Sequence, residues 1–169
     1  MSDALIQIVD ENDQPLSAAT IDEAQTKGLI HRIVRIMIED TSGKVLLQKR
    51  LATQKIYPNC WDNSAAGHVD AGETYEVAAA RELAEEIGLT NLELKEISYY
   101  PSNGRFKDRL LNRFNKVYKA IVDPGVKLTL QADEVADAKW FTVDEVKKLI
   151  TDPPNQVTDG VIEVFERYY

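Results

Sequence analysis

Three glutamates stand close together in one short stretch of the chain. Residues 74–87 have the pattern of a helix, and at about 100° per residue Glu82, Glu85 and Glu86 fall on one side of it. Like charges at these spacings repel one another and weaken a helix. Mg²⁺ takes oxygen ligands and is usually held by a few carboxylates together with substrate phosphate. The spacing therefore predicts a site for a hard divalent cation.

The rest of this helix divides into two kinds of position. Most of the half opposite the glutamates is apolar and consists of Val77, Ala80, Leu83, Ala84 and Ile87. The small Ala78 and Ala79 lie on the glutamate side, where we expect them to leave room for a metal ion and a phosphate. The alternative is a solvated acidic face, which is common in a chain with 28 acidic and 20 basic residues.

A longer motif surrounds the glutamates. It consists, at fixed spacings, of Gly67, Glu73, Arg81, Glu82, Leu83, Glu85, Glu86, Gly88 and Leu89. This pattern resembles the Nudix box without a departure, and so many fixed positions are a far more specific signal than a lone glycine motif. The resemblance implies an α/β fold, namely an α/β/α sandwich with a mixed central sheet. It also implies a hydrolase that cuts a diphosphate linked to another group, usually a nucleoside, with Mg²⁺ or Mn²⁺ as cofactor.

The resemblance assigns roles to the residues of the box. It implies a set of metal ligands made up of Glu82, Glu85, Glu86 and, through its carbonyl, Gly67. Glu73 and Arg81 are expected to brace the loop against the helix without binding substrate, because a bidentate arginine–carboxylate pair fixes the positions of its members. Arg81 is also spaced to pair with Glu85 one turn later.

The general base has two candidates. Glu86 is the first choice within the box, while Glu134, which directly precedes a predicted strand, is the candidate outside it. The alternative for Glu134 is an ordinary exposed loop acid.

Basic residues elsewhere are candidates for substrate binding. Arg50 ends a predicted strand and is expected to emerge near the box, where it could bind phosphate. Arg105 and Arg109 belong to a basic run over residues 101–116, in which Tyr99, Tyr100, Phe106 and Phe114 could stack a base. The alternative is a solvated hairpin with core aromatic residues, and Arg50 could equally be a surface residue.

The histidines and the cysteine carry weaker signals. His31 and His68, with a carboxylate, could form a transition-metal site, although isolated histidines are more often packing or surface residues. Cys60 is the only cysteine and is expected to be a plain packed thiol.

Strands and helices alternate along the chain. We expect strands over residues 4–9, 30–39, 45–50, 92–99, 110–122 and 135–141, with an extended segment over 61–66. The 45–50 strand should return from a turn at 41–44 as the partner of 30–39. Capping boxes at Thr20 and Thr142 predict helices that run to Gly28 and Ile150, and a last helix covers 161–168. The prediction is one domain, residues 1–169, with 1–28 as a possible appendage.

Composition limits the partners of the chain. A formal net charge of -8 argues against a general nucleic-acid binder, which needs a basic surface. No stretch approaches the roughly 20 apolar residues of a membrane span. The first residues do not form a secretory signal, so a soluble cytoplasmic protein is expected. Its expected partner is a small-molecule diphosphate substrate, and because family members are often dimers, the resemblance allows a homodimer.

A second, looser resemblance narrows the family branch. Residues 57–68, His31-Arg32 and residues 9–13 are similar to the Nudix branch that contains isopentenyl-diphosphate isomerase and its hydrolase relatives. The isomerase chemistry needs a cysteine directly before the box glycine, where this chain has Ala66, and metal carboxylates from a later strand, where residues 109–122 contain none. We therefore predict a hydrolase. The alternative from another class is a catalytically idle regulator that binds a nucleotide.

Overall fold

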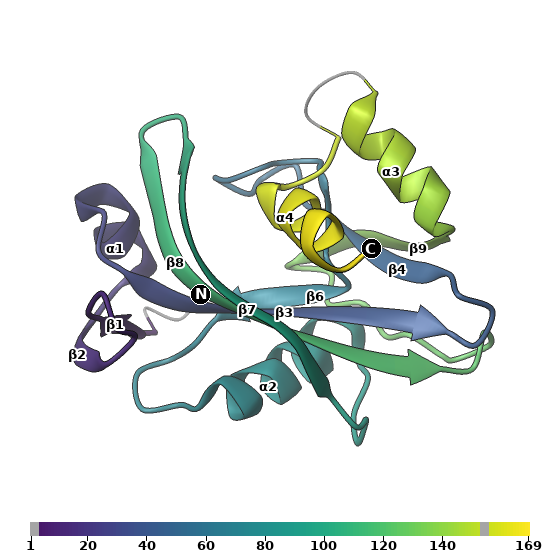
Figure 1. Cartoon of the computed structure of the whole chain (residues 1–169), viewed down its shortest axis with the longest axis horizontal. Helices are drawn as coiled ribbons and strands as arrows, with labels where there is room; N and C mark the ends of the chain where they lie inside the picture. The colour runs from purple at the N-terminus through teal and green to yellow at the C-terminus, as the bar shows by residue number, and fades with distance from the viewer. Residues whose placement is uncertain (1–3, 153–155) are drawn as a thin grey trace.

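The computed structural model describes residues 4–152 and 156–169, in which helices lie on both faces of a mixed β-sheet (Figure 1). The strands are β1 (Ile6–Val9), β2 (Pro15–Ala19), β3 (His31–Asp40), β4 (Val45–Arg50), β5 (Trp61–Asp62), β6 (Ala65–His68), β7 (Lys95–Phe106), β8 (Arg109–Val122) and β9 (Val135–Phe141). The helices are α1 (Ile21–Lys27), α2 (Tyr75–Ile87), α3 (Val143–Thr151) and α4 (Asp159–Tyr168).

Strand β3 is the centre of the sheet. It pairs in parallel with β8 from His31↔Arg113 to Asp40↔Val122, and its other side pairs antiparallel with β6. Strand β4 joins β3 only at Glu39↔Val45 and then runs beside β9 and β5. The prediction that 45–50 is the hairpin partner of 30–39 is therefore wrong beyond the turn, because β6 and β8 already occupy both sides of β3. The sheet therefore splits into two parts: β6 stays paired with β3, whereas β4 leaves β3 and pairs with β5 and β9.

Alternate residues of β3 face two different cores. Val34, Ile36 and Ile38 pack with α2, whereas Met37 packs with α4 on the opposite face. This two-residue period is the normal consequence of a pleated strand that is covered on both sides. The arrangement confirms the expected α/β/α sandwich.

Helix α2 buries the side that carries two of its glutamates. Glu82 and Glu86 are 9% and 6% exposed, whereas Val77, on the apolar half, is 55% exposed. Ala78 and Ala79 are fully buried in the core. The expectation that these alanines leave room for metal and phosphate is therefore wrong, because side chains of the sheet and of neighbouring segments fill the space beside them.

The chain before β3 extends the sheet at one edge. Strand β1 pairs with the unanticipated strand β2 and meets β3 at Ile8↔His31. Strand β1 and the preceding Leu5 also bind the loop that leads into α2, since Gln7 N donates to Val69 O, Ala71 N to Leu5 O, and Gly72 N to the Gln7 side chain. This segment thus lies against the first part of the box.

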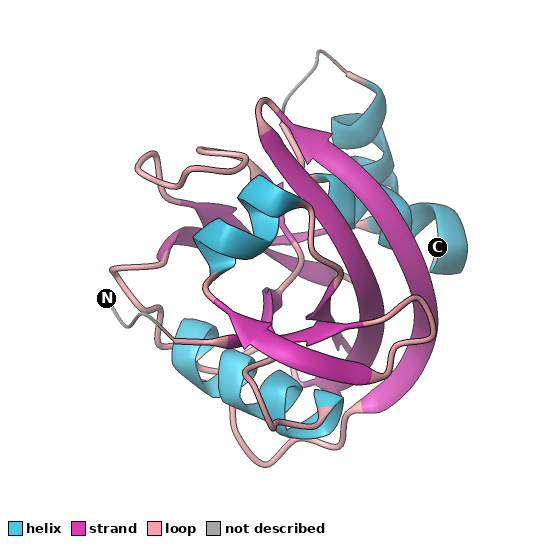
Figure 2. Cartoon of the chain, turned by 90° about the vertical axis from the view of Figure 1, so that its left-hand side faces the viewer, coloured by secondary structure: helices cyan, strands magenta, loops and turns pink. Residues whose placement is uncertain are grey.

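Strands β7 and β8 form one long curved hairpin, which passes beside α1 in Figure 2. The predicted strand 92–99 begins later, at Lys95, and continues to Phe106, because residues 101–106 also pair with β8. The turn lies at Lys107, which adopts a positive φ of 55°. Helices α1 and α3 begin after Thr20 and Thr142 as predicted, and α4 begins at Asp159, slightly earlier than expected. None of the helices in residues 4–152 and 156–169 is long and apolar enough to cross a membrane.

Candidate active site

Three carboxylates from two parts of the chain meet beside β6. Glu82 and Glu86 of α2 and Glu134 of the loop before β9 each bring an oxygen within 4.8 Å of the others. Glu82 and Glu86 are buried and Glu134 is exposed. Carboxylates this close repel one another, and a divalent cation among them would remove that repulsion. The chemistry of the donor set therefore fits Mg²⁺ or Mn²⁺.

Removal from solvent raises the pKa values of the three glutamates in this cluster. It raises the pKa of Glu82 to about 7, against the partly opposing effect of Arg81. Burial, with the nearby carboxylate of Glu82, raises the pKa of Glu86 well above its usual range. Partial shielding from solvent, together with Glu85, raises the pKa of Glu134. A cation bound among these groups would favour their ionised forms.

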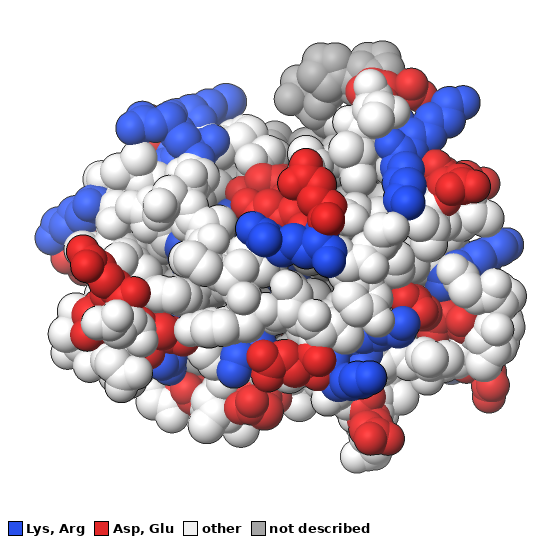
Figure 3. Space-filling view, in the orientation of Figure 1, with Lys and Arg blue, Asp and Glu red and all other residues white. Residues whose placement is uncertain are grey.

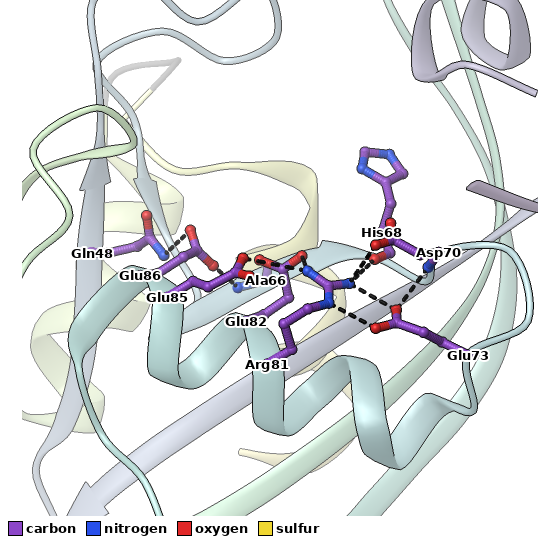
Figure 4. A network of polar contacts seen from close by, with 9 residues as sticks. All are labelled: Gln48, Ala66, His68, Asp70, Glu73, Arg81, Glu82, Glu85 and Glu86. Carbon is purple, nitrogen blue, oxygen red and sulfur yellow. Dashed lines mark hydrogen bonds and ion pairs between the residues drawn. The ribbon is translucent and has the colours of Figure 1, made fainter. Parts of the chain in front are cut away.

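Both oxygens of Glu86 are held by the protein (Figure 4). Its Oε1 accepts a hydrogen bond from Ala66 N at 2.8 Å, and its Oε2 accepts one from Gln48 Nε2 at 2.9 Å. Sequence reasoning missed Gln48 and Ala66 as neighbours of the glutamate. The sequence carried little signal for this contact, because Gln48 begins the polar half of β4 and is followed by Lys49 and Arg50.

Arg81 forms the brace that the box implies (Figure 4). Its Nε and Nη2 donate to the two oxygens of Glu73, both at 2.8 Å, and Nη2 also donates to His68 O. Its Nη1 donates to Glu82 Oε1 at 2.8 Å. The hydrogen bonds from Arg81 lower the pKa of Glu73. Arg81 thereby ties the loop before α2 to one of the clustered carboxylates.

Glu85 lies apart from the cluster of three. Its side chain is 52% exposed and its Oε2 is 3.4 Å from Arg81 Nη1, so the predicted i, i+4 contact is present. A role of Glu85 as a metal ligand stays a prediction.

Gly67 lies on β6, directly over Glu82. A Cβ atom at position 67 would overlap the carboxylate of Glu82. Because that carboxylate ends a flexible side chain, Gly67→Ala should displace it without unfolding the protein. We expect Mn²⁺ binding, measured by calorimetry, to weaken about tenfold or more while the unfolding midpoint stays close to wild type. Gly125→Ala is the matched control, since nothing lies within 4 Å of its added Cβ; equal Mn²⁺ affinity in the two variants would contradict this placement of Glu82.

The basic candidates lie in two places. Arg50 is engaged by loop groups, because its guanidinium donates to Ile56 O, Asp62 and Gln54. Arg109 donates to Asp22 of α1 at 2.7 Å, and Arg105 is exposed near the turn of the hairpin. Figure 3 shows Lys and Arg side chains gathered over this turn, which lies above the sheet in Figure 1, whereas α2 lies below it. Substrate binding by these three residues stays a prediction.

The two histidines lie close to each other and to the positively charged side chain of Arg113. The rings of His31 and His68 have centroids 5.3 Å apart, and Arg113 stands opposite His31 in the β3–β8 register. Burial, together with Arg113, lowers the pKa of His31 to about 4 and holds that of His68 well below its usual range. Among the described residues, the candidate metal group contains neither histidine.

Buried His31 should destabilise the protein in acid. Its pKa is about 4 in the folded chain and 6.5 as a model value, so the unfolded chain binds more protons between these values and stability falls as pH falls from 6.5 towards 4. Between pH 7 and pH 5 this should cost the wild type about 2 kcal/mol. In urea unfolding, His31→Gln should lose less stability over this interval by that amount. The same pH dependence in both proteins would refute the assignment.

Comparison with known proteins assigns the chain to a class of hydrolases that act on phosphorus-containing anhydrides. The model of the NUDIX domain matches residues 29–159. The chain is 39% identical to an uncharacterised Nudix hydrolase of Pseudomonas aeruginosa, over 83% of this chain and 80% of that protein. It is 33% identical to isopentenyl-diphosphate Delta-isomerase 2 of Photorhabdus laumondii, over 92% of this chain and 87% of that protein.

A solved structure agrees in fold. The crystal structure of DR0079 from Deinococcus radiodurans superposes with a TM-score of 0.80 at 20% identity, covering 98% of this chain and 99% of that one. The chain belongs to the Nudix family, as the box predicts, and it is a hydrolase acting on phosphorus-containing anhydrides.

Proposed function

We propose that this protein uses Mg²⁺ or Mn²⁺ to hydrolyse the diphosphate bond of a nucleoside diphosphate-linked or related small molecule. The observation that carries the proposal is the meeting of Glu82, Glu86 and Glu134 within 4.8 Å, beside the braced loop of the box. A divalent ion bound there would neutralise phosphate oxygens and increase the acidity of water. Glu82, Glu86 and the Gly67 carbonyl would hold the ion, and Glu85 would complete the set.

We infer that Glu134, rather than Glu86, is the general base. Each oxygen of Glu86 accepts a hydrogen bond from the protein, and in this proposal its remaining acceptor positions face the ion instead of taking a proton. Glu134 is exposed and lies on a loop, so its carboxylate can approach a water molecule beside the substrate. As the water oxygen attacks phosphorus, Glu134 takes its proton, and the bond from phosphorus to the bridging oxygen breaks.

Arg50 remains the best candidate for binding the substrate's phosphate. It is paired with Asp62 at 3.3 Å, and Asp62 stands opposite Gln48, whose side chain donates to Glu86. Arg50 is therefore near the cluster. We retain Arg105 and Arg109 as candidates for a more distant part of the substrate.

Isomerisation is the second candidate function, because an isopentenyl-diphosphate isomerase is among the similar proteins. Two observations favour hydrolysis. Ala66 occupies the position before the box glycine and has no acid–base group. Arg113, a cation, stands beside the paired histidines where an ion site would need a carboxylate.

We also propose that residues 1–169 form one domain with 1–28 as an N-terminal extension. The hydrogen bonds of β1 to the loop of residues 69–72 support one unit. The extension precedes the segment matched by the family model.

The test is a phosphate-release screen of the purified protein against nucleoside triphosphates, nucleotide sugars, dinucleotides and other diphosphates. It is run with Mg²⁺, with Mn²⁺ and with chelator, and isopentenyl diphosphate is also assayed for its isomer. Metal-dependent turnover of one class would support the hydrolase and identify its substrate. Formation of the isomer alone would replace it with the isomerase. No turnover, with a nucleotide still raising the unfolding midpoint, would favour the idle regulator.

A further inference from the structure

We infer that Gln48 is a positioning residue that sets the orientation of the Glu86 carboxylate for metal binding. This inference rests on the proposed function of the Glu82–Glu86–Glu134 cluster. Gln48 lies on β4, outside the box, and it is 2% exposed. A buried glutamine is unfavourable unless its amide is hydrogen-bonded, so its partners indicate why it is tolerated there.

The amide of Gln48 connects β4 to α2 and to Ser64, which directly precedes β6. Its Nε2 donates to Glu86 Oε2 at 2.9 Å and to Ser64 O at 3.3 Å. The other oxygen of Glu86 accepts from Ala66 N of β6. Glu86 thus bridges the place where the sheet divides, with one oxygen held from β4 and the other from β6 (Figure 4).

This arrangement orients the carboxylate without saturating it. The two oxygens of an ionised carboxylate offer about four acceptor positions, and the two protein donors use one on each oxygen. Positions therefore remain for a cation, while the rotation of the group is restricted. Neighbours of this kind, which orient metal ligands, commonly change metal affinity or activity when they are replaced.

An amide suits this position better than other side chains do. A lysine or arginine would place a competing positive charge beside the cation site, and a glutamate would add another buried negative charge. An aliphatic side chain would leave Glu86 Oε2 without its donor. Glutamine is neutral, donates a hydrogen bond and reaches Glu86 from β4.

The test replaces Gln48 with methionine, which has a similar length and no donor. Gln25→Met is the matched control, because Gln25 is also a buried glutamine, 6% exposed, but lies in α1. Mn²⁺ binding is measured by calorimetry, and kcat and KM are measured with the best substrate of the screen. We expect Gln48→Met to weaken Mn²⁺ binding and lower kcat by about 10- to 100-fold with little change in KM. Gln25→Met should alter neither quantity.

The inference is overturned if folded Gln48→Met keeps the Mn²⁺ affinity and kcat of the control, even when its unfolding midpoint falls. Such a result would make the contact purely structural. If methionine prevents folding, Gln48→Asn provides the same comparison with an amide that is one methylene too short. If the wild type hydrolyses nothing, the proposed function fails, whereas the difference in Mn²⁺ binding still decides the role of Gln48.

Discussion

Glutamine in place of Glu86 is expected to lower kcat by about a thousandfold, because a metal contributes several kcal/mol of charge stabilisation and about 1.4 kcal/mol corresponds to a tenfold change. The substitution keeps the size of the side chain and removes its charge from the cluster with Glu82 and Glu134. Steady-state kinetics and Mn²⁺ calorimetry on the same preparation should therefore show loss of turnover and of metal affinity together. Turnover equal to wild type would refute the assignment of Glu86.

Glu134→Gln provides the contrasting case. If Glu134 is the base, kcat should fall by about 10²- to 10⁴-fold, the usual contribution of a positioned proton acceptor. Mn²⁺ affinity should change much less than in Glu86→Gln, since Glu82 and Glu86 would still hold the ion. Equal losses of metal affinity in the two variants would instead make Glu134 a ligand and return the role of base to another residue.

Alanine in place of Asp13 is expected to cause the largest loss of stability, about 3–5 kcal/mol, which is typical when one partner of a buried ion pair is removed. Asp13 is 8% exposed and accepts hydrogen bonds from Tyr75 OH at 2.8 Å, Tyr99 OH at 2.6 Å and Arg32 Nε at 2.6 Å. The substitution leaves Arg32 Nε and two tyrosine hydroxyls without their acceptor, while Arg32 Nη2 keeps its hydrogen bond to the Asp13 carbonyl. It also removes contacts that join the N-terminal segment to α2 and β7.

Urea unfolding measures this loss, and Asp10→Ala is the control. Asp10 lies in the same turn, but its carboxylate accepts from the backbone N–H groups of Asn12 and Gln14 at an exposed position. Its replacement should cost about 1 kcal/mol. A similar loss in both variants would mean that the turn, and not the buried contacts of Asp13, determines the stability.

Local features of this protein were predictable from sequence, and contacts between distant segments were not. The box and the starts of α1 and α3 depend on residues a few positions apart, so their spacing is informative. Gln48 meets Glu86 only because β4 separates from β3, a feature of sheet topology that no local pattern contains. The sequence suggested Glu134 as a candidate base, but it could not show that Glu134 lies beside Glu82 and Glu86.

The orientation of α2 illustrates a second limit. Apolar periodicity would place Val77 and Ala80 towards a core, yet the helix buries the side with Glu82 and Glu86. Local rules fail most often where a functional site requires buried charge. Arg81, Gln48 and the Ala66 N–H provide the hydrogen bonds that make this burial tolerable.

The hydrogen bonds made by β1 and Leu5 determine where the N-terminus of this protein can be shortened. The family match starts at residue 29, but the backbone partners of Val69 and Ala71 come from Leu5 and Gln7. A shortened version beginning at residue 29 would leave these groups to water and free the loop that precedes α2. Truncations designed on the family match alone would thus alter the loop of residues 69–72, even though every residue of the box was retained.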